Sequence, residues 1–277
     1  MDTSGPGLVA VTPGYVVLLV LLVVVAVGAA RLGVIGVARN VVTASLRATV
    51  QLAVVSTVIA MVLGVWWGTV AFVGLMLTVA SATSARRVSP HGPRAWAAGI
   101  PVVAGALPVT VAVVLAGTMP LEPVTLLTVA GIIGGGAMTA TSLAGRRSLD
   151  ELRDRRGEYE AALALGLVER DAALLVCRPV AASALVPSLD QTRTVGLVTL
   201  PGAFVGVLLG GGSALQAGAT QLLVLVALLA ADTIAVALTL ELVARGVLTP
   251  EPLAPTPRRN DSPAARVGRS VRATLRR

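Results

Sequence analysis

The sequence predicts an all-α polytopic membrane protein with about seven transmembrane helices, and two observations support this fold class. Of the 277 residues, 55% are apolar and only 13% are charged, which is about half the charged fraction of a typical soluble domain. Several apolar runs also approach or exceed the ~18 residues that indicate a membrane span. This composition excludes disorder for most of the chain and argues against a soluble globular core.

The expected spans follow one another as apolar runs. The first run follows residues 1–13, whose single charged side chain is Asp2, so we expect a retained span rather than a cleaved signal peptide with its basic leader. At ~1.5 Å per residue, about 20 helical residues cover the ~30 Å hydrocarbon core, and the shorter runs must extend a little beyond their apolar centres. The seven expected spans cover 15–30, 48–64, 65–80, 95–117, 123–144, 195–211 and 222–244.

The arginines predict the orientation of these spans. All 22 basic residues are Arg, and if the N-terminus is outside, every one of them falls on the inner side, whereas the outer segments carry only Asp2 and Glu122. This is the positive-inside distribution. We therefore expect an outer N-terminus and a cytoplasmic C-terminus in the cell (inner) membrane. The apolar segment 172–187 is expected to be a cytoplasmic or interfacial helix, because one more crossing would export Arg193 or the Arg-rich tail.

The same map gives the domain organisation. Residues 1–245 form the expected membrane domain, with a cytoplasmic loop over 146–194 between spans five and six. Residues 246–277 form an Arg- and Pro-rich cytoplasmic tail, which we expect to be disordered and to lie on anionic lipid. The net charge of +8 is accounted for by these inner segments, so a nucleic-acid partner is not expected.

Several kinds of chemistry are excluded by residues that the sequence lacks. It contains no Lys, so a standard Walker A nucleotide site and a Schiff-base lysine are both impossible. His91 and Cys177 are single representatives of their types, which excludes a His/Cys metal cluster within one chain. No carboxylate pair or nucleophile–base set is apparent. A membrane-embedded enzyme is therefore the least favoured class.

The longest polar stretch, 146–171, is the most informative part of the chain. Acidic and basic residues recur at helical spacing, as in Glu151 with Arg155 and Arg156 with Glu160, and such pairs stabilise a helix by a few tenths of a kcal/mol each. A glycine and an apolar continuation follow this charged segment. Taken alone, the pattern fits either a compact element that docks on a partner or a solvated loop helix.

The residues that follow resemble a known motif. Glu160-Ala161-Ala162, three residues and then Gly166 resemble the EAA loop of ABC-transporter permeases, and Pro179 stands where that family has its proline, although Arg178 replaces a leucine. The resemblance implies a coupling helix that contacts a separate ABC ATPase subunit, which would carry ATP and Mg²⁺, while this chain binds no cofactor. One coupling loop per chain further implies a homodimer. The implied coupling residues are Glu160, Ala161, Ala162, Gly166 and Pro179.

A second resemblance covers most of the membrane part. Residues 153–160, 196–202 (Gly-Leu-Val-Thr-Leu-Pro-Gly) and 210–217 resemble FetB-type permeases, a family with a bacterial iron exporter and plant members linked to aluminium tolerance. Shorter similarities occur at 45–52 and 135–138. The resemblance implies export of an iron-like metal ion.

Departures from that family bear on the cargo. Ala203-Phe204-Val205 stand where the bacterial pattern has methionine, and Gly135 and Asp190 replace asparagines. These replacements lower the number of soft thioether ligands and of amide ligands available to a metal ion. Iron, another metal and a small organic solute all remain open as cargo, and the metal ligands are unknown.

Polar residues inside apolar runs are the candidates for the transport pathway. An ionised group at the bilayer centre costs about 2.5–3.5 kcal/mol on insertion scales and normally faces a bundle interior or cavity. Asp232 is either such a pathway carboxylate or a neutral, hydrogen-bonded packing residue. Pro201 and Gly202 fit either a hinge or a static kink. The pathway candidates are Gln51, Met138, Thr139, Asp190 and Asp232.

Two other functional classes stay open at this point. An ion-coupled carrier or channel that uses Asp232 would need no ATPase, but no convincing internal repeat of the kind typical of such carriers is visible. A membrane-anchored scaffold would need few polar groups within its spans. The sequence therefore favours a transporter permease subunit over both.

Overall fold

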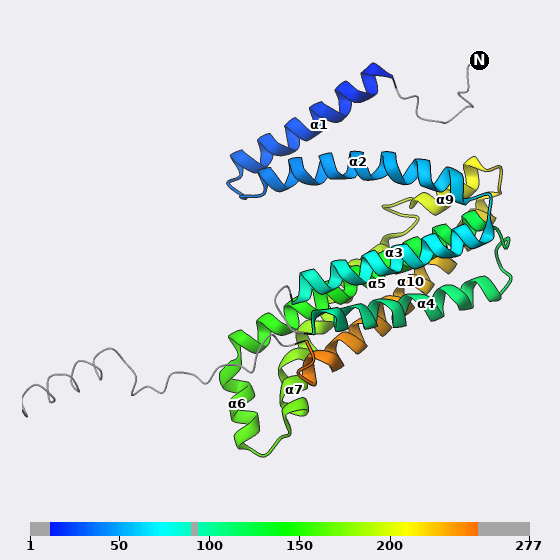
Figure 1. Cartoon of the computed structure of the whole chain (residues 1–277). Helices are drawn as coiled ribbons and strands as arrows, with labels where there is room; N and C mark the ends of the chain where they lie inside the picture. Colours follow the sequence, from blue (N-terminus) through cyan, green and yellow to red (C-terminus); the bar gives the residue numbers. More distant parts are fainter. Residues whose placement is uncertain (1–11, 90–93, 249–277) are drawn as a thin grey trace, which may run out of the picture. The chain divides into compact units, whose positions relative to one another are not determined.

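A computed structural model describes residues 12–89 and 94–248, and these residues are almost entirely helical (Figure 1). Within these ranges there is no strand, only one isolated bridge between Val195 and Thr199. His91 and residues 249–277, which include nearly all of the expected disordered tail, lie outside the described residues.

The predicted all-α membrane fold is confirmed. Seven helical segments of the described chain are long and apolar enough to cross a bilayer. Five of them lie at the expected places before the polar stretch, and one, α10, covers the last expected span. The α-helices of these six are α1 (Pro13–Leu32), α2 (Ala38–Val62), α3 (Trp66–Val88), α4 (Gly99–Leu115, preceded by the 3₁₀ turn Ala95–Ala98), α5 (Pro123–Asp154) and α10 (Ala214–Ala244).

The sixth span differs from the prediction. The expected helix over 195–211 is instead a turn followed by α9 (Gly202–Leu209), whose eight residues rise only ~12 Å. The long apolar segment is Glu169–Thr194, which includes the segment 172–187 that we expected at the membrane interface. It consists of α7 (Glu169–Ala181), a 3₁₀ turn (Ala182–Leu185) and α8 (Val186–Thr194). The orientation of the termini and the extent of the cytoplasmic loop stay predictions.

The helix break before α9 has a local cause. Gly196 has φ +79°, and the Thr194 carbonyl accepts hydrogen bonds from the amides of Leu197, Val198 and Thr199, which closes a tight turn. Pro201 then starts α9 as its N-cap, since proline has no amide hydrogen to continue a helix from upstream. Hydrophobicity alone marks this segment as a span, and its backbone chemistry prevents a long helix.

The chain forms two compact units. The described part of the first comprises residues 12–76, 110–132 and 192–226, and that of the second comprises 77–89, 94–109, 133–191 and 227–248. In the first unit, α1 and α2 pack together as a hairpin (Figure 1), and the Thr69 hydroxyl donates to the carbonyls of Val62 and Val65 at the start of α3.

The second unit contains the larger hydrophobic core. Side chains from α3, α5, α7 and α10 meet there, among them Leu149, Val176, Cys177 and Val243. A smaller cluster of alanines from α5, α7 and the following 3₁₀ turn packs on Val236 of α10. This core holds α7 and α10 against α5.

Candidate functional site

The first candidate feature is a helical hairpin formed by α6 (Arg156–Ala164) and α7, which pack against each other at one end of the second unit (Figure 1). Gly166 ends α6 with φ +93°. Its amide donates to the Leu163 carbonyl at 2.9 Å, and the Leu167 amide donates to the Ala162 carbonyl at 3.1 Å. This pair of bonds is a Schellman motif, whose left-handed position favours glycine. The glycine of the implied coupling loop therefore makes the sharp turn of the hairpin.

The predicted charge pairs at the end of α5 and on α6 are confirmed. Arg156 contacts Glu160 at 2.8 Å, and Arg155 contacts Glu151 at 3.5 Å. Arg155 also reaches Glu158 at 2.7 Å. These pairs lie on the exposed side of the helix, where each contributes little to stability. They orient the Glu160 carboxylate within the surface of α6.

The opposite side of α6 anchors the hairpin to the protein core. Ala162 is buried, and Tyr159 packs against the core of the second unit. Burial raises the pKa of the Tyr159 phenol, and the nearby Glu169 carboxylate raises it further. The phenol is therefore neutral at physiological pH, as a side chain packed against a hydrophobic core requires.

The tip of the hairpin exposes apolar side chains. Leu165 is 83% exposed and Val168 63% exposed, and Leu167 is also exposed. They lie between two short helices whose other faces are charged or packed. Ala161 and Pro179 are exposed as well, on α6 and α7. The hairpin thus combines a rigid base with an apolar tip, which suits it for contact with a protein partner.

An ion pair fixes the first turn of α7 to α10. The Arg170 guanidinium donates to both carboxylate oxygens of Glu241, with Nε–Oε1 at 2.7 Å and Nη2–Oε2 at 2.8 Å. Arg245 donates to the same carboxylate at 2.6 Å. A bidentate arginine–carboxylate pair fixes orientation as well as distance. Movement of the hairpin is therefore coupled to the end of α10.

The second candidate feature is Asp232 on α10, which is buried with 1% exposure. The Ser188 hydroxyl of α8 donates a short hydrogen bond to its Oδ2 atom, whereas Oδ1 has no hydrogen-bond partner. Gly136 of α5 lies directly beside Oδ1. Sequence reasoning identified Asp232 but not Ser188 or Gly136, because nothing in a single sequence pairs α8 and α5 with the middle of α10.

The structure places the other sequence candidates on α2, α5 and α8, and at the start of α9. The Thr139 hydroxyl donates to the Gly135 carbonyl within α5. The Met138 carbonyl accepts bonds from Ser142 of α5 and from Ser84 of α3. Gln51 is exposed on α2 and Asp190 is exposed on α8. The roles of all these residues stay predictions, as do those of Pro201 and Gly202 at the start of α9.

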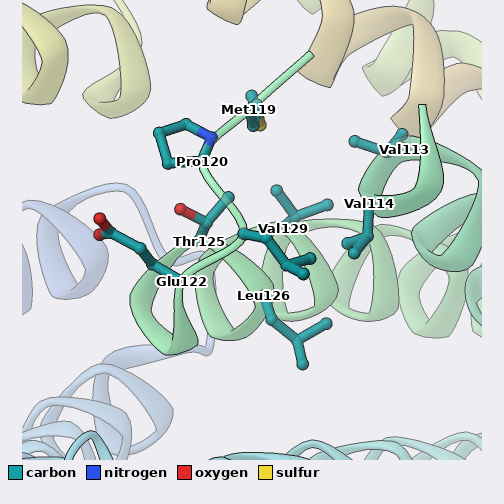
Figure 2. Close-up of a pocket in the computed structure, with 9 residues that line it drawn as sticks. Val113, Val114, Met119, Pro120, Glu122, Thr125, Leu126 and Val129 are labelled. Carbon is teal, nitrogen blue, oxygen red and sulfur yellow. The ribbon is translucent and has the colours of Figure 1, made fainter. Parts of the chain in front are cut away.

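The described residues contain no metal cluster, and two pockets among them are lined mainly by apolar side chains, one of them an open groove of about 470 Å³ beside Ser81 and α4. No three His, Cys, Asp or Glu side chains come together within these ranges. Figure 2 shows a small pocket between α4 and α5, which is lined by Val113, Leu126 and others and encloses about 10 Å³. This volume is at most that of one water molecule. The Glu122 carboxylate lies at the pocket edge and points away from Val113 and Val114 (Figure 2).

Comparison with known proteins agrees with the membrane fold. Residues 14–248 match the sequence profile described as "Uncharacterised protein family (UPF0014)". The chain belongs to this family. The UPF0014 assignment and the seven apolar helices together identify a multi-pass membrane protein. No solved structure matches the chain.

Several UPF0014 relatives carry descriptive names. "UPF0014 membrane protein STAR2" of Oryza sativa subsp. japonica is 34% identical over 208 residues, which are 74% of this chain and 71% of the rice protein. "Protein ALUMINUM SENSITIVE 3" of Arabidopsis thaliana is 34% identical over 57% of this chain, and the match spans 58% of the Arabidopsis protein. "Probable iron export permease protein FetB" of Escherichia coli (strain K12) is 26% identical over 77% of this chain and 83% of the relative.

Proposed function

We propose that this chain is the membrane-spanning subunit of an ABC transporter, which exports a metal ion and is driven by a separate ATPase subunit. The α6–α7 hairpin carries the proposal. It projects from the apolar helices, keeps a fixed turn at Gly166 and is tied to α10 by the bidentate contact of Arg170 with Glu241. A partner bound at its tip can therefore transmit movement to a long membrane helix.

The metal cargo and the direction of transport are inferred from the name of a relative. The E. coli protein named as a probable iron export permease matches 77% of this chain. The described residues offer no ready metal cluster, which suits a transported ion better than a permanently bound one, since a transported ion must leave its site. With one hairpin per chain, two copies of the chain would pair with two ATPase subunits.

The test is co-purification of the tagged chain with an ATPase subunit from its native membrane in mild detergent. We expect a stoichiometric partner with a Walker A loop in wild type and its loss in Gly166→Pro, because proline cannot adopt φ +93°. Gly157→Ala is the matched control, since a methyl group there meets no atom within 4 Å. A clean homo-oligomer without any ATPase in wild type would contradict the proposal.

The Glu160 carboxylate of the proposed coupling loop allows a second test, in which transport by two variants is compared. Glu160→Arg should abolish ATP-driven transport while the chain still inserts in the membrane. Arg156→Glu breaks the same 2.8 Å ion pair but leaves Glu160 in place, so this control should retain most transport. If Glu160→Arg transports as well as this control, the hairpin is not the coupling element.

A second candidate function is supported by the buried Asp232 carboxylate. An ATP-independent carrier or channel for cations would use such a group within its spans. The purified chain in liposomes, without any ATPase, would then transport the cation, and Asp232→Asn would abolish that transport. The ATP-driven proposal instead requires both subunits for transport in the same liposomes.

A further inference from the structure

The buried carboxyl group of Asp232 is only half satisfied. Its Oδ2 atom accepts the hydrogen bond from Ser188, and its Oδ1 atom has no partner although the side chain is 99% buried, leaving 1% exposed. An ionised carboxylate in such a place would lack both water and a counter-ion, which is far more costly than a neutral carboxyl group with one unpaired oxygen. The group therefore needs a positive ligand or a proton.

The space beside Oδ1 decides between a metal ion and a proton as the positive ligand. A Cβ atom built on Gly136 would lie 2.7 Å from Oδ1 and would overlap the Leu228 side chain. The oxygen therefore faces the α5 backbone at close range. A metal ion needs roughly four to eight ligand atoms around it, whereas the contact between Asp232 and Ser188 brings two oxygen-bearing side chains together, and no three His, Cys, Asp or Glu side chains of the described residues form a cluster. A proton needs no coordination shell.

The charged groups on the packed elements are engaged elsewhere. α4 and the 3₁₀ turn Ala182–Leu185 contain no titratable side chain. On α5, Arg146 donates to the Ser142 carbonyl and Arg147 to Ser183. On α7 and α10, Arg170 and Arg245 bind Glu241. The remaining titratable groups of these elements are Asp190 and Arg193 on α8, Asp150, Glu151, Arg153 and Asp154 at the end of α5, and Glu169, Asp171, Cys177 and Arg178 on α7. Asp232 itself forms no ion pair with any described residue.

We propose that Asp232 is a proton-binding site, in which the dry contact between α5, α8 and α10 holds the carboxyl group neutral and Ser188 reports its protonation state to α8. Loss of the proton leaves a buried charge that the present packing cannot accommodate. Release of a proton therefore requires α8 or α5 to move away from α10 so that water reaches Oδ1. Proton release and this local opening are one event.

Infrared spectroscopy of the purified chain in lipid nanodiscs tests this inference directly, with no ATPase present. A protonated carboxyl group has a C=O stretching band above the amide and carboxylate bands. We expect this band at neutral pH in wild type and its loss in Asp232→Asn. In Ser188→Ala the band should move to higher frequency, because the carbonyl loses its hydrogen bond.

Asp190→Asn is the matched control, because Asp190 lies two residues from Ser188 on the same helix but is exposed. The band should be unchanged in this variant. Absence of the band from wild type at neutral pH overturns the inference, and this result does not depend on whether Asp232→Asn folds. A band that persists in folded Asp232→Asn overturns it as well. The proposed function is tested by co-purification of the ATPase, which is a separate measurement, so failure of one proposal can be distinguished from failure of the other.

Discussion

At the scale of single residues, close helix contacts depend on a few glycines whose positions the sequence does not rank. The spacing of Gly131 and Gly135 suggests a small-residue contact face. In the structure a Cβ on Gly135 would meet nothing within 4 Å, and one on Gly131 would meet only the flexible end of Met76 at 3.1 Å. The tight contacts on α5 are instead at Gly145, beside Val88 of α3, and at Gly136, which faces Asp232.

This difference gives a prediction for two adjacent alanine variants. Gly136→Ala should lower the free energy of unfolding by about 1–3 kcal/mol, since the added methyl group overpacks the contact with α10. Gly135→Ala should be neutral or raise it by roughly 0.5–1 kcal/mol, because alanine favours the helix where there is space. Thermal or denaturant unfolding in detergent measures both. Equal effects of the two variants would contradict the geometry.

At the scale of elements, the hairpin depends on its attachment to α10. α7 contributes several buried side chains to the core, among them Leu174, Val176 and Cys177, and its first turn adds the two-pronged contact of Arg170 with Glu241. The same carboxylate also accepts a bond from Arg245 of the following turn. A network of this kind fixes the angle between two helices better than an isolated surface pair does.

A double-mutant cycle tests that attachment. Arg170→Gln and Glu241→Gln should each lower the Tm, and the double variant should be little worse than Glu241→Gln alone, because both changes remove the same contact. Arg153→Gln is the control, since its pair with Asp150 is exposed and lies within one turn of helix at 3.4 Å. Strictly additive losses for Arg170 and Glu241 would show that the two side chains act independently.

At the scale of the whole molecule, the distribution of arginines predicts how the chain lies in the membrane. The hairpin tip should face the cytoplasm, and the loop between α4 and α5 should face outward. Leu165 at the tip and Leu121 in that loop are 83% and 66% exposed, so both positions can report which side they occupy. The sequence has a single cysteine, Cys177, which is buried.

Cysteine labelling in a Cys177→Ala background checks this topology. In sealed cells, a membrane-impermeant thiol reagent should label Leu121→Cys at once, whereas Leu165→Cys should react only after the membrane is opened. The positive-inside rule gives this outcome, because most arginines then lie on the inner side, although Arg178 and Arg193 fall within the sixth long helical segment. Labelling of Leu165→Cys from outside sealed cells would show that the topology is inverted. The hairpin would then lie on the outer side, where a cytoplasmic ATPase could not reach it.

The sequence by itself determined the class of protein, the number of long apolar helices and the place of the hairpin. Apolar length, arginine distribution and the motif from Glu160 to Gly166 are properties of consecutive residues. The thickness of the bilayer sets the length of an apolar helix, and the helix period sets which nearby side chains pair, so both can be recognised from consecutive residues. Asp232 also stood out, because a charge within a long apolar run is visible without any partner.

Only the tertiary structure decided which segment forms the sixth long helix and what surrounds Asp232. Apolar composition alone did not separate 195–211 from 169–194, and the turn at Gly196 with Pro201 favoured the earlier segment. Ser188, Gly136 and Asp232 are separated by 44 residues or more, and they meet only because α5, α8 and α10 pack together. Contacts between distant segments depend on how the helices pack, which hydrophobicity and local spacing leave undetermined.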